Sequence, residues 1–245
     1  METIVEETKQ EMGRAAARDV ASALRDTLSQ RGEANIIVAT GMSQFEMLEN
    51  LVKEPDIEWG KVTMFHLDEY IGLDTSHPAS FCRYLQERLE AKLPEAPAAF
   101  HYINGMAPDP RQECRRVGEL IKEHPIDVAC VGIGENGHLA FNDPPADFDT
   151  EEPYIVVDLD EDCRKQQLGE GWFDSLDDVP EQAISMSIKQ IMRSRKIVVT
   201  CPDERKAEAV KNVVNGEITN MCPASVLQEH SDCKLFLDRQ SASLL

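Results

Sequence analysis

Short apolar segments alternate with helical patterns along most of the chain, and this alternation limits the folds open to it. Five segments rich in valine, isoleucine and leucine predict buried strands: Asn35–Thr40, Val62–Asp68, Asp127–Ile133, Lys196–Cys201 and Lys234–Leu237. Apolar residues three or four positions apart predict helices over Lys9–Gln30, Ser43–Leu51, Ser80–Leu93, Pro110–Glu123 and Asp203–Val214. Parallel strands that are apolar throughout need cover on both sides. The sequence therefore predicts an α/β fold with a mostly parallel sheet and helices on both faces.

The chain has 245 residues and reads as a single domain over residues 1–245, without an internal repeat or a low-complexity linker. Its 25 Lys and Arg against 45 Asp and Glu give a formal charge of −20. Binding to nucleic acid or to anionic lipid needs clustered cations. The acidic composition therefore argues against a nucleic-acid partner and against a membrane-surface role.

Hydropathy and cysteine usage bear on location and on metal binding. No apolar run approaches the roughly 20 residues of a membrane helix, and the acidic start Met1–Glu7 does not resemble a signal peptide. Seven scattered cysteines without a C-x-x-C pair argue against a disulfide framework and against a zinc site. The sequence thus predicts a cytoplasmic protein with reduced thiols and no metal.

In parallel sheets, ligands bind beyond the carboxyl ends of the strands, and the first polar strand end is Thr40-Gly41-Met42-Ser43-Gln44. Gly41 permits a tight turn, and Ser43 is the predicted N-cap of the helix that follows. The free N–H groups and the positive dipole end of that helix suit a phosphate group. The segment is therefore a candidate phosphate-binding turn, with ordinary helix capping as the alternative.

The second strand end places two neighbouring carboxylates, Asp68 and Glu69, directly after an apolar strand. Burying a carboxylate costs free energy unless it is paired or has a functional role. Adjacent residues on a strand point to opposite faces, so both carboxylates cannot address one ligand. We predict that one of them faces a site while the other is structural; a solvated loop start is the alternative.

The third strand end is the glycine-rich segment 132–144, with the sequence Gly-Ile-Gly-Glu-Asn-Gly-His-Leu-Ala-Phe-Asn-Asp-Pro. It brings an amide (Asn136), an imidazole (His138) and a carboxylate (Asp143) within eight residues. Its glycines match the G-x-G-x-x-G spacing, but no long helix follows, which argues against dinucleotide binding. The density of polar groups favours a functional turn.

Two segments beyond this turn carry further predictions. Asn142–Pro153 is rich in proline and acidic residues, and its length and position lead to the hypothesis of a lid over the site. The acidic run Asp158–Asp162 is predicted to be a solvated loop.

These segments, in this order, resemble the glucosamine-6-phosphate deaminase family, also called glucosamine-6-phosphate isomerases, whose superfamily includes the 6-phosphogluconolactonases. The matching motifs are Thr40-Gly41-x-Ser43, Phe65-x-x-Asp68-Glu69-Tyr70-x-Gly72-Leu73, His77-Pro78-x-Ser80-Phe81, Gly132-x-Gly134-x-Asn136-Gly137-His138-x-Ala140-Phe141-Asn142 and Lys206-Ala207. Together they span nearly the whole chain. The resemblance implies a Rossmann-like fold and, in amino-sugar catabolism, conversion of glucosamine 6-phosphate into fructose 6-phosphate and ammonia.

The resemblance also implies roles for individual residues. Asp68 is implied as the general base that carries a proton between C2 and C1 through an enediol, and His138 as the group that opens the sugar ring, assisted by Asn136 and Asp143. Contacts to substrate and phosphate are implied for Thr40, Gly41, Met42, Ser43, Glu69, Gly137 and Lys206. Neither step needs a metal or an organic cofactor. The expected partner is a small-molecule sugar phosphate, and the expected assembly is a monomer or a small homo-oligomer.

The chain departs from the family pattern at two places. Asp143 stands where family members usually have glutamate, and the stretch 169–173 lacks the phosphate-binding arginine of many members. Arg164 and Lys165 are the candidates to replace that arginine. Because of these departures, another amino-sugar phosphate, such as galactosamine 6-phosphate, remains the alternative substrate.

Two other functions are compatible with the superfamily. A 6-phosphogluconolactonase typically has arginine after the Asp-Glu pair, where this chain has Tyr70, so the motif favours the deaminase. A sugar-phosphate sensor without turnover would need neither Asp68 nor His138, and this chain has both.

Overall fold

The computed structural model of the chain describes residues 1–169 and 171–245, and over these residues it contains two β-sheets. The larger sheet has the strand order β1-β10-β9-β6-β2-β3-β5, and all its pairings are parallel. Its strands are β1 (Glu2–Glu6), β2 (Ala34–Val38), β3 (Val62–His66), β5 (Ala99–His101), β6 (Val128–Val131), β9 (Lys196–Cys201) and β10 (Cys233–Asp238). The smaller sheet is antiparallel and consists of β4 (Asp68–Tyr70), β8 (Gln182–Met186) and β7 (Tyr154–Asp158).

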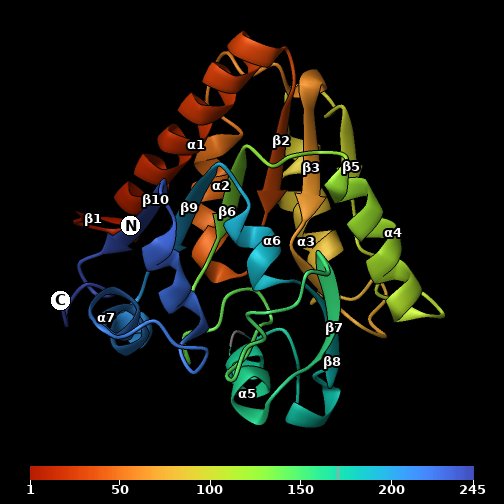
Figure 1. The fold of residues 1–245 in the computed structure, drawn as a ribbon, viewed down its shortest axis with the longest axis vertical. Helices are drawn as coiled ribbons and strands as arrows, with labels where there is room; N and C mark the ends of the chain where they lie inside the picture. Colours follow the sequence, from red (N-terminus) through yellow and green to blue (C-terminus); the bar gives the residue numbers. More distant parts are fainter. Residues whose placement is uncertain (170) are drawn as a thin grey trace.

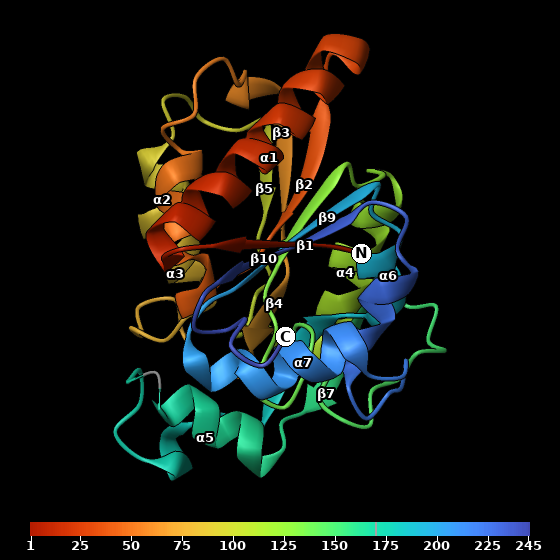
Figure 2. The same ribbon diagram turned by 90° about the vertical axis from the view of Figure 1, so that its left-hand side faces the viewer.

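Helices cover both faces of the larger sheet, which confirms the predicted α/β architecture (Figures 1 and 2). On one face lie α1 (Lys9–Arg31), α2 (Phe45–Leu51) and α3 (Phe81–Arg88), and on the other α4 (Pro110–Lys122), α6 (Ile188–Met192) and α7 (Ala207–Asn215). Alternate strand residues feed the two cores: Ile36 packs with α1 and α2, whereas Ile37 packs with α4 and α7. The remaining helix, α5 (Glu161–Gly169), lies below the carboxyl ends of the strands (Figure 1).

Short 3₁₀ helices flank these elements: η1 (Met42–Gln44), η2 (Trp59–Lys61), η3 (Glu90–Lys92), η4 (Leu176–Asp178), η5 (Glu204–Lys206) and η6 (Pro223–Glu229). Helix ends follow local sequence in most places. Gly32 ends α1 in the left-handed conformation, with a φ of 79°, which glycine adopts readily. The prediction that Ser43 caps a helix was wrong, because Ser43 lies inside η1 and makes no capping hydrogen bond.

The predicted strand Val62–Asp68 is divided in the structure, and the division determines where Asp68 lies. The chain leaves the larger sheet after His66 and enters the smaller one at Asp68. Leu67 links the two sheets, since its N–H donates to the carbonyl of Val38 (3.2 Å) and its carbonyl accepts from the N–H of Met186 (3.0 Å). Asp68 therefore begins a new strand where the two sheets meet.

Several elements were not predicted from the sequence. These include β1 and β5 at the two edges of the larger sheet, the strands β7 and β8 of the smaller one, and the short helix α6. The acidic run Asp158–Asp162, predicted as a loop, instead ends β7 and begins α5. Acidic residues in a first helical turn are stabilised by the helix dipole, which explains why this run can start a helix.

The strand order has a reversal point between β2 and β6, which are paired with Ile36 opposite Val128. From β2 the chain proceeds outward through β3 and β5, whereas β6, β9 and β10 lie on the other side. Crossover connections therefore diverge at this point and leave a crevice beyond the carboxyl ends of the two strands. This crevice is the expected ligand site of a Rossmann-like sheet.

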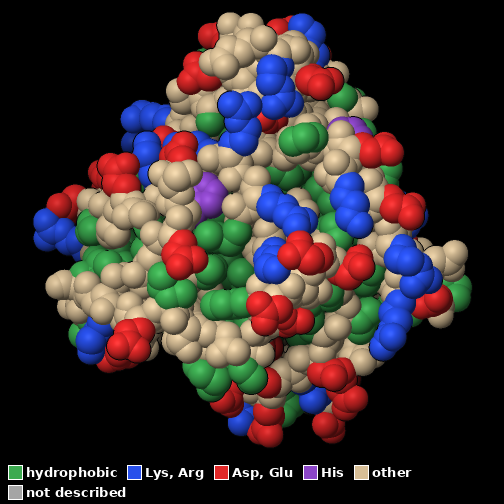
Figure 3. All heavy atoms as spheres, viewed as in Figure 1, with side chains coloured by type: hydrophobic (Ala, Val, Ile, Leu, Met, Phe, Trp, Pro, Cys, Tyr) green, Lys and Arg blue, Asp and Glu red, His purple; other side chains and the backbone are tan. Residues whose placement is uncertain are grey.

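Two further features of the fold are the distribution of charge on its surface and the apolarity of its helices. On the face shown in Figure 3, Lys and Arg side chains are interspersed with Asp and Glu and form no continuous basic stripe. None of the helices in the described part of the chain combines the length and apolarity that a membrane span requires.

Candidate active site

A cleft opens at the reversal point, and most of the predicted site residues line it. Its walls include seven of them: Thr40, Gly41, Met42, Ser43, Asp68, His138 and Lys206. Further walls come from α5, through Gln166 and Gln167, and from the segment before α7, through Asp203 and Arg205. The structure thus gathers the ends of β2, β3 and β6 around one space. Four predicted residues do not line this cleft: Glu69, Asn136, Gly137 and Asp143.

The turn after β2 is held close to the turn after β6. Gly41 has a φ of 87° and a ψ of 170°, a conformation that essentially only glycine adopts without strain. A Cβ on Gly132 would lie 2.6 Å from Oγ of Ser43, so only glycine lets the two turns approach this closely. The serine hydroxyl and the N–H groups of this turn consequently border the cleft beside the turn after β6.

Gln44, which the sequence analysis did not single out, fixes this arrangement. The side chain is fully buried, and its Nε2 donates to Oγ1 of Thr200 (2.7 Å), the carbonyl of Val131 (3.1 Å) and Oγ of Ser43 (3.2 Å). One amide thereby connects β6, β9 and the turn after β2. No local motif signals this role, because its main partners are distant in sequence.

Asp68 faces the cleft from the first position of β4 and is almost completely buried. No side-chain hydrogen bond to its carboxylate is found among residues 1–169 and 171–245. Burial, and secondarily the nearby charge of Glu69, raises the pKa of Asp68 to about 8. A carboxylate with this pKa is a much stronger base than an ordinary aspartate.

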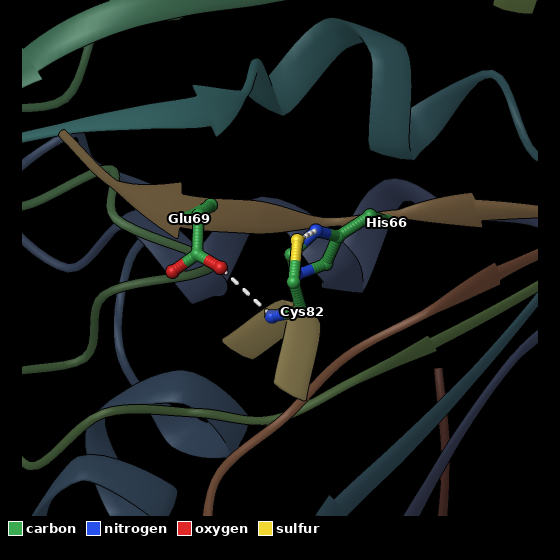
Figure 4. A group of neighbouring side chains, drawn as sticks. All are labelled: His66, Glu69 and Cys82. Carbon is green, nitrogen blue, oxygen red and sulfur yellow. Dashed lines mark hydrogen bonds between the residues drawn. The ribbon is translucent and has the colours of Figure 1, made fainter. Parts of the chain in front are cut away.

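Glu69 lies on the opposite side of β4, as alternation along a strand requires. Its carboxylate accepts hydrogen bonds from the N–H groups of Tyr70, Phe81 and Cys82, at 2.7–3.1 Å, and from Oγ of Ser80 at 3.0 Å. Figure 4 shows the bond to Cys82 at the start of α3. The implied substrate contact of Glu69 is therefore corrected: the structure places this carboxylate at the N-terminus of a helix, outside the cleft.

The turn after β6 presents His138 to the cleft with little freedom to move. A Cβ on Gly134 would lie 2.3–2.4 Å from the imidazole ring, so the ring packs directly on the glycine backbone. The backbone N–H of His138 donates to Oδ1 of Asn136 (3.0 Å), and Nδ1 lies 3.1 Å from Oδ1 of Asp143. The imidazole is thus oriented by a carboxylate on one side and by the turn itself on the other.

Asp143 and Asn136 stand behind His138 and do not border the cleft. Nδ2 of Asn136 donates to Oδ1 of Asp143 (3.2 Å). Burial favours a higher pKa for Asp143, but hydrogen bonds from His138, Asn136 and Cys163 outweigh it, so the pKa lies below its usual range. No sequence motif pointed to Cys163 of α5. Burial and the charge of Asp143 raise the pKa of Cys163, so it remains a thiol.

Gly137 contributes conformation to the same turn. Its φ is 83°, and a Cβ there would lie 2.8 Å from Sγ of Cys222. A side chain at this position would displace the turn that carries His138. The structure thus assigns Gly137 a role in shaping the turn, and its implied substrate contact stays a prediction.

Two cations border the cleft in the described residues, Lys206 and Arg205. The two candidates for the missing arginine are occupied elsewhere. Arg164 donates from Nη2 to the carbonyls of Leu176 (2.7 Å) and Val179 (3.0 Å), and Lys165 pairs with Glu161 (2.6 Å) on the same helix. Neither lines the cleft, which corrects that interpretation. Glu170, inside the stretch that lacks the arginine, lies outside the described residues.

The predicted lid does not border the cleft either. None of residues 142–153 contributes to its walls, whereas α5 contributes two glutamines. Oε1 of Gln166 accepts from the N–H of Glu135 (2.9 Å), and Oε1 of Gln167 accepts from the hydroxyl of Tyr70 (2.8 Å). Helix α5 is thus joined both to the turn after β6 and to β4.

Two side-chain groups have donor atoms of the kinds that ligate metals. His66, Glu69 and Cys82 form one, drawn in Figure 4, and His138, Asp143 and Cys163 form the other. In the first, the Glu69 carboxylate is already engaged by N–H groups and the Cys82 thiol donates to the carbonyl of Ile103 (3.1 Å). The donors of this group are therefore used in packing β3 and β4 against α3, and the expectation of a metal-free protein stays a prediction.

Comparison with known proteins agrees with this geometry. The profile of the glucosamine-6-phosphate isomerase/6-phosphogluconolactonase family matches residues 7–236. A glucosamine-6-phosphate deaminase of Listeria monocytogenes is 39% identical over 216 residues, covering 87% of this chain and 89% of its own. A glucosamine-6-phosphate deaminase of Streptococcus pyogenes is 39% identical over 224 residues, covering 91% and 92%.

Solved structures give the same result. A monomeric glucosamine-6-phosphate deaminase superposes with a TM-score of 0.91 at 32% identity and covers 100% of both chains. A 6-phosphogluconolactonase from Trypanosoma brucei has a TM-score of 0.80 at 16% identity, covering 100% of this chain and 98% of its own, which shows a shared fold alone. On its sequence, its fold and the arrangement of its cleft, the chain belongs to the glucosamine-6-phosphate isomerase/6-phosphogluconolactonase family.

Proposed function

We propose that this protein is a glucosamine-6-phosphate deaminase, which converts glucosamine 6-phosphate and water into fructose 6-phosphate and ammonia. The observation that carries the proposal is the content of a single cleft. It holds a buried carboxylate with a raised pKa, an imidazole oriented by a second carboxylate, and a serine-containing turn beside two cations. The similarity to deaminases at 39% identity over most of both chains supports the same activity.

Thr40, Gly41, Met42 and Ser43 would bind the phosphate, together with Lys206. The N–H groups of a turn that leads into a helix, a hydroxyl and a cation are the donors that phosphate oxygens accept from most readily. Their place at the reversal point of the sheet supports this assignment. Because the chain carries a formal charge of −20, affinity for an anionic substrate must come from these local donors.

His138 would open the pyranose ring by moving a proton between the ring oxygen and O1. An imidazole can both accept and donate a proton near neutral pH. Asp143, 3.1 Å from Nδ1, would hold the ring orientation and stabilise the imidazolium, and Asn136 would hold Asp143. The shorter aspartate is accommodated because it lies directly against His138 and Cys163.

Asp68 would then act as the base on the open-chain sugar. It would take the proton from C2 while O1 gains a proton, which gives an enolamine, and would return the proton to C1 as the nitrogen loses one, which leaves an imine at C2. Water hydrolyses this imine to the ketone and ammonia. One carboxylate on one face of the substrate suffices for a transfer between adjacent carbons. The raised pKa of Asp68 supports this role, since it increases the basicity needed to remove a proton from carbon.

The proposal also covers the location, the oligomeric state and the domain organisation of the enzyme. All seven cysteines are free, which supports a cytoplasmic location with reduced thiols. The similarity to a monomeric deaminase over its full length supports a monomer or a small homo-oligomer. Residues of the small sheet, such as Met186, share a core with β2 and β6, which supports a single domain over residues 1–245.

The test is ammonia release from purified protein with glucosamine 6-phosphate, coupled to detection of fructose 6-phosphate, with galactosamine 6-phosphate in parallel. Formation of both products from the gluco substrate at equal rates is expected. Turnover of the galacto substrate alone would assign a different amino-sugar phosphate. No turnover of either would refute the deaminase assignment.

A further inference from the structure

We propose that Arg205 is the second cation of the phosphate subsite, and that Glu135 on the catalytic turn competes with the substrate's phosphate for it. The inference deepens the proposed function and rests on it. No motif pointed to Arg205, and neither Arg164 nor Lys165 reaches the cleft.

Arg205 lies next to Lys206 in η5, between β9 and α7. Its side chain borders the same cleft as the turn Thr40–Ser43, although it is about half exposed, at 46%. A ligand held by Lys206 and Ser43 therefore lies within the space that Arg205 also faces.

The charge of the ligand favours a second cation in the subsite. A sugar phosphate carries close to two negative charges at neutral pH, and Lys206 supplies one positive charge. Among the described residues that border the cleft, Arg205 is the other cation. A guanidinium offers two parallel N–H groups to phosphate oxygens, so it adds orientation as well as charge.

Glu135 forms an ion pair with Arg205. Its Oε1 lies 3.3 Å from Nη1 of Arg205, and with 37% of its side chain exposed this ion pair is accessible to water. Exposed ion pairs are weak, so a dianion in the cleft can take the guanidinium from the glutamate. The backbone N–H of Glu135 stays bound to Gln166, so only side chains need to move.

The experiment measures two constants in single variants: the inhibition constant of inorganic phosphate and the KM for glucosamine 6-phosphate. Arg205→Gln should raise both constants at least about tenfold with kcat changed less than about threefold, because the contact is far from the reacting carbons. Arg205→Lys should recover part of the loss. Glu135→Gln should lower both constants about two- to fivefold, because it removes the competing anion.

Lys53→Gln is the matched control, since it removes one positive charge from a surface lysine that pairs with Glu49 of α2 and does not border the cleft. Both constants should stay within about twofold of the parent. Equal behaviour of Arg205→Gln and Lys53→Gln would overturn the assignment of Arg205. If the inhibition constant and the KM of Glu135→Gln are unchanged or raised, Glu135 does not compete with phosphate for Arg205.

Direct binding of inorganic phosphate, followed by calorimetry on the same folded variants, separates this inference from the proposed function. If the parent protein shows no deaminase turnover but phosphate binding weakens in Arg205→Gln, the function is refuted and the phosphate subsite is kept. Turnover in the parent together with unchanged phosphate binding in Arg205→Gln would refute the subsite and keep the function.

Discussion

The two sides of β4 carry neighbouring carboxylates in opposite surroundings. On the α3 side, Glu69 is fully engaged by three N–H groups and the hydroxyl of Ser80. On the cleft side, Asp68 is equally buried, and no side-chain donor to it is found in the part of the chain that the structure describes. The same desolvation acts on both groups, and it raises the pKa of each.

The difference shows that burial alone does not make a carboxylate reactive. Donated hydrogen bonds stabilise the charged form of Glu69 and tie it to the start of a helix. Asp68 has no such compensation among the described residues, which agrees with the role of base proposed for it. One side of the strand is therefore structural, and the following predictions test whether the other side carries the chemistry.

The largest expected effect is on turnover in Asp68→Asn. Removing the base should lower kcat by about 10²–10⁴-fold, whereas substrate affinity should change little, because the amide keeps the shape of the carboxyl group. Steady-state kinetics together with calorimetric binding of fructose 6-phosphate measures both quantities. Turnover that stays within a few-fold of the parent would remove Asp68 from the mechanism.

The pH dependence of kcat/KM should reveal the raised pKa. Asp68 must be ionised to accept a proton, so the rate should rise with pH about tenfold per unit up to a midpoint near 8. An ordinary aspartate would place this limb near pH 4. Glu69→Gln removes a charge that raises the pKa of Asp68, so the limb should move to lower pH in that variant. A limb at the same pH in both proteins would contradict the coupling of the two carboxylates.

Stability should respond to Asp68 in the opposite sense from activity. The folded-state pKa of Asp68 lies above its unfolded value, so the folded protein binds the proton more tightly and its stability falls as pH rises from about 4 to about 8. Asp68→Asn should therefore be more stable than the parent at pH 8, by an amount on the order of a few kcal/mol, and equal to it near pH 4. Urea unfolding at the two pH values measures this, and a variant less stable than the parent at pH 8 would contradict it.

Glu69→Gln should destabilise the protein, because a neutral amide cannot accept all the donors that the carboxylate satisfies. Loss of charge-assisted hydrogen bonds predicts a cost of about 2–3 kcal/mol, or a fall in Tm of roughly 5–10 °C for a chain of this size. Calorimetric unfolding gives the Tm. At temperatures well below it, kcat should stay within about tenfold of the parent; a loss as large as that of Asp68→Asn would erase the distinction between the two sides of β4.

The smallest effect is expected for Ser80→Ala, at the edge of the structural side. Ser80 accepts from the N–H of Arg83 as the N-cap of α3 and donates to Glu69. Loss of the cap and of one hydrogen bond predicts about 1–2 kcal/mol of destabilisation with unchanged kinetic constants. A loss of kcat as large as that of Asp68→Asn would contradict the structural role of this side of the strand.

Local sequence determined the architecture and the chemical groups of the site. Central parallel strands are apolar along their length, so β2, β3, β6, β9 and β10 and most of the helices between them are visible as patterns. Asp68, His138 and Ser43 directly follow or closely follow such strands, so their place in a common cleft also followed from the order of elements. Alternation along a strand separated Asp68 from Glu69 in advance.

Tertiary structure decided everything that depends on contacts between distant segments. The antiparallel sheet escaped prediction because its short strands are stabilised by pairing with one another, β8 with β4 on one side and with β7 on the other. Gln44 is fixed by Thr200, which lies 156 positions away, and Arg205 reaches the cleft only because η5 folds beside the turn after β2. The pKa of Asp68 likewise depends on what surrounds it, and only the folded chain supplies the low-dielectric environment that raises it.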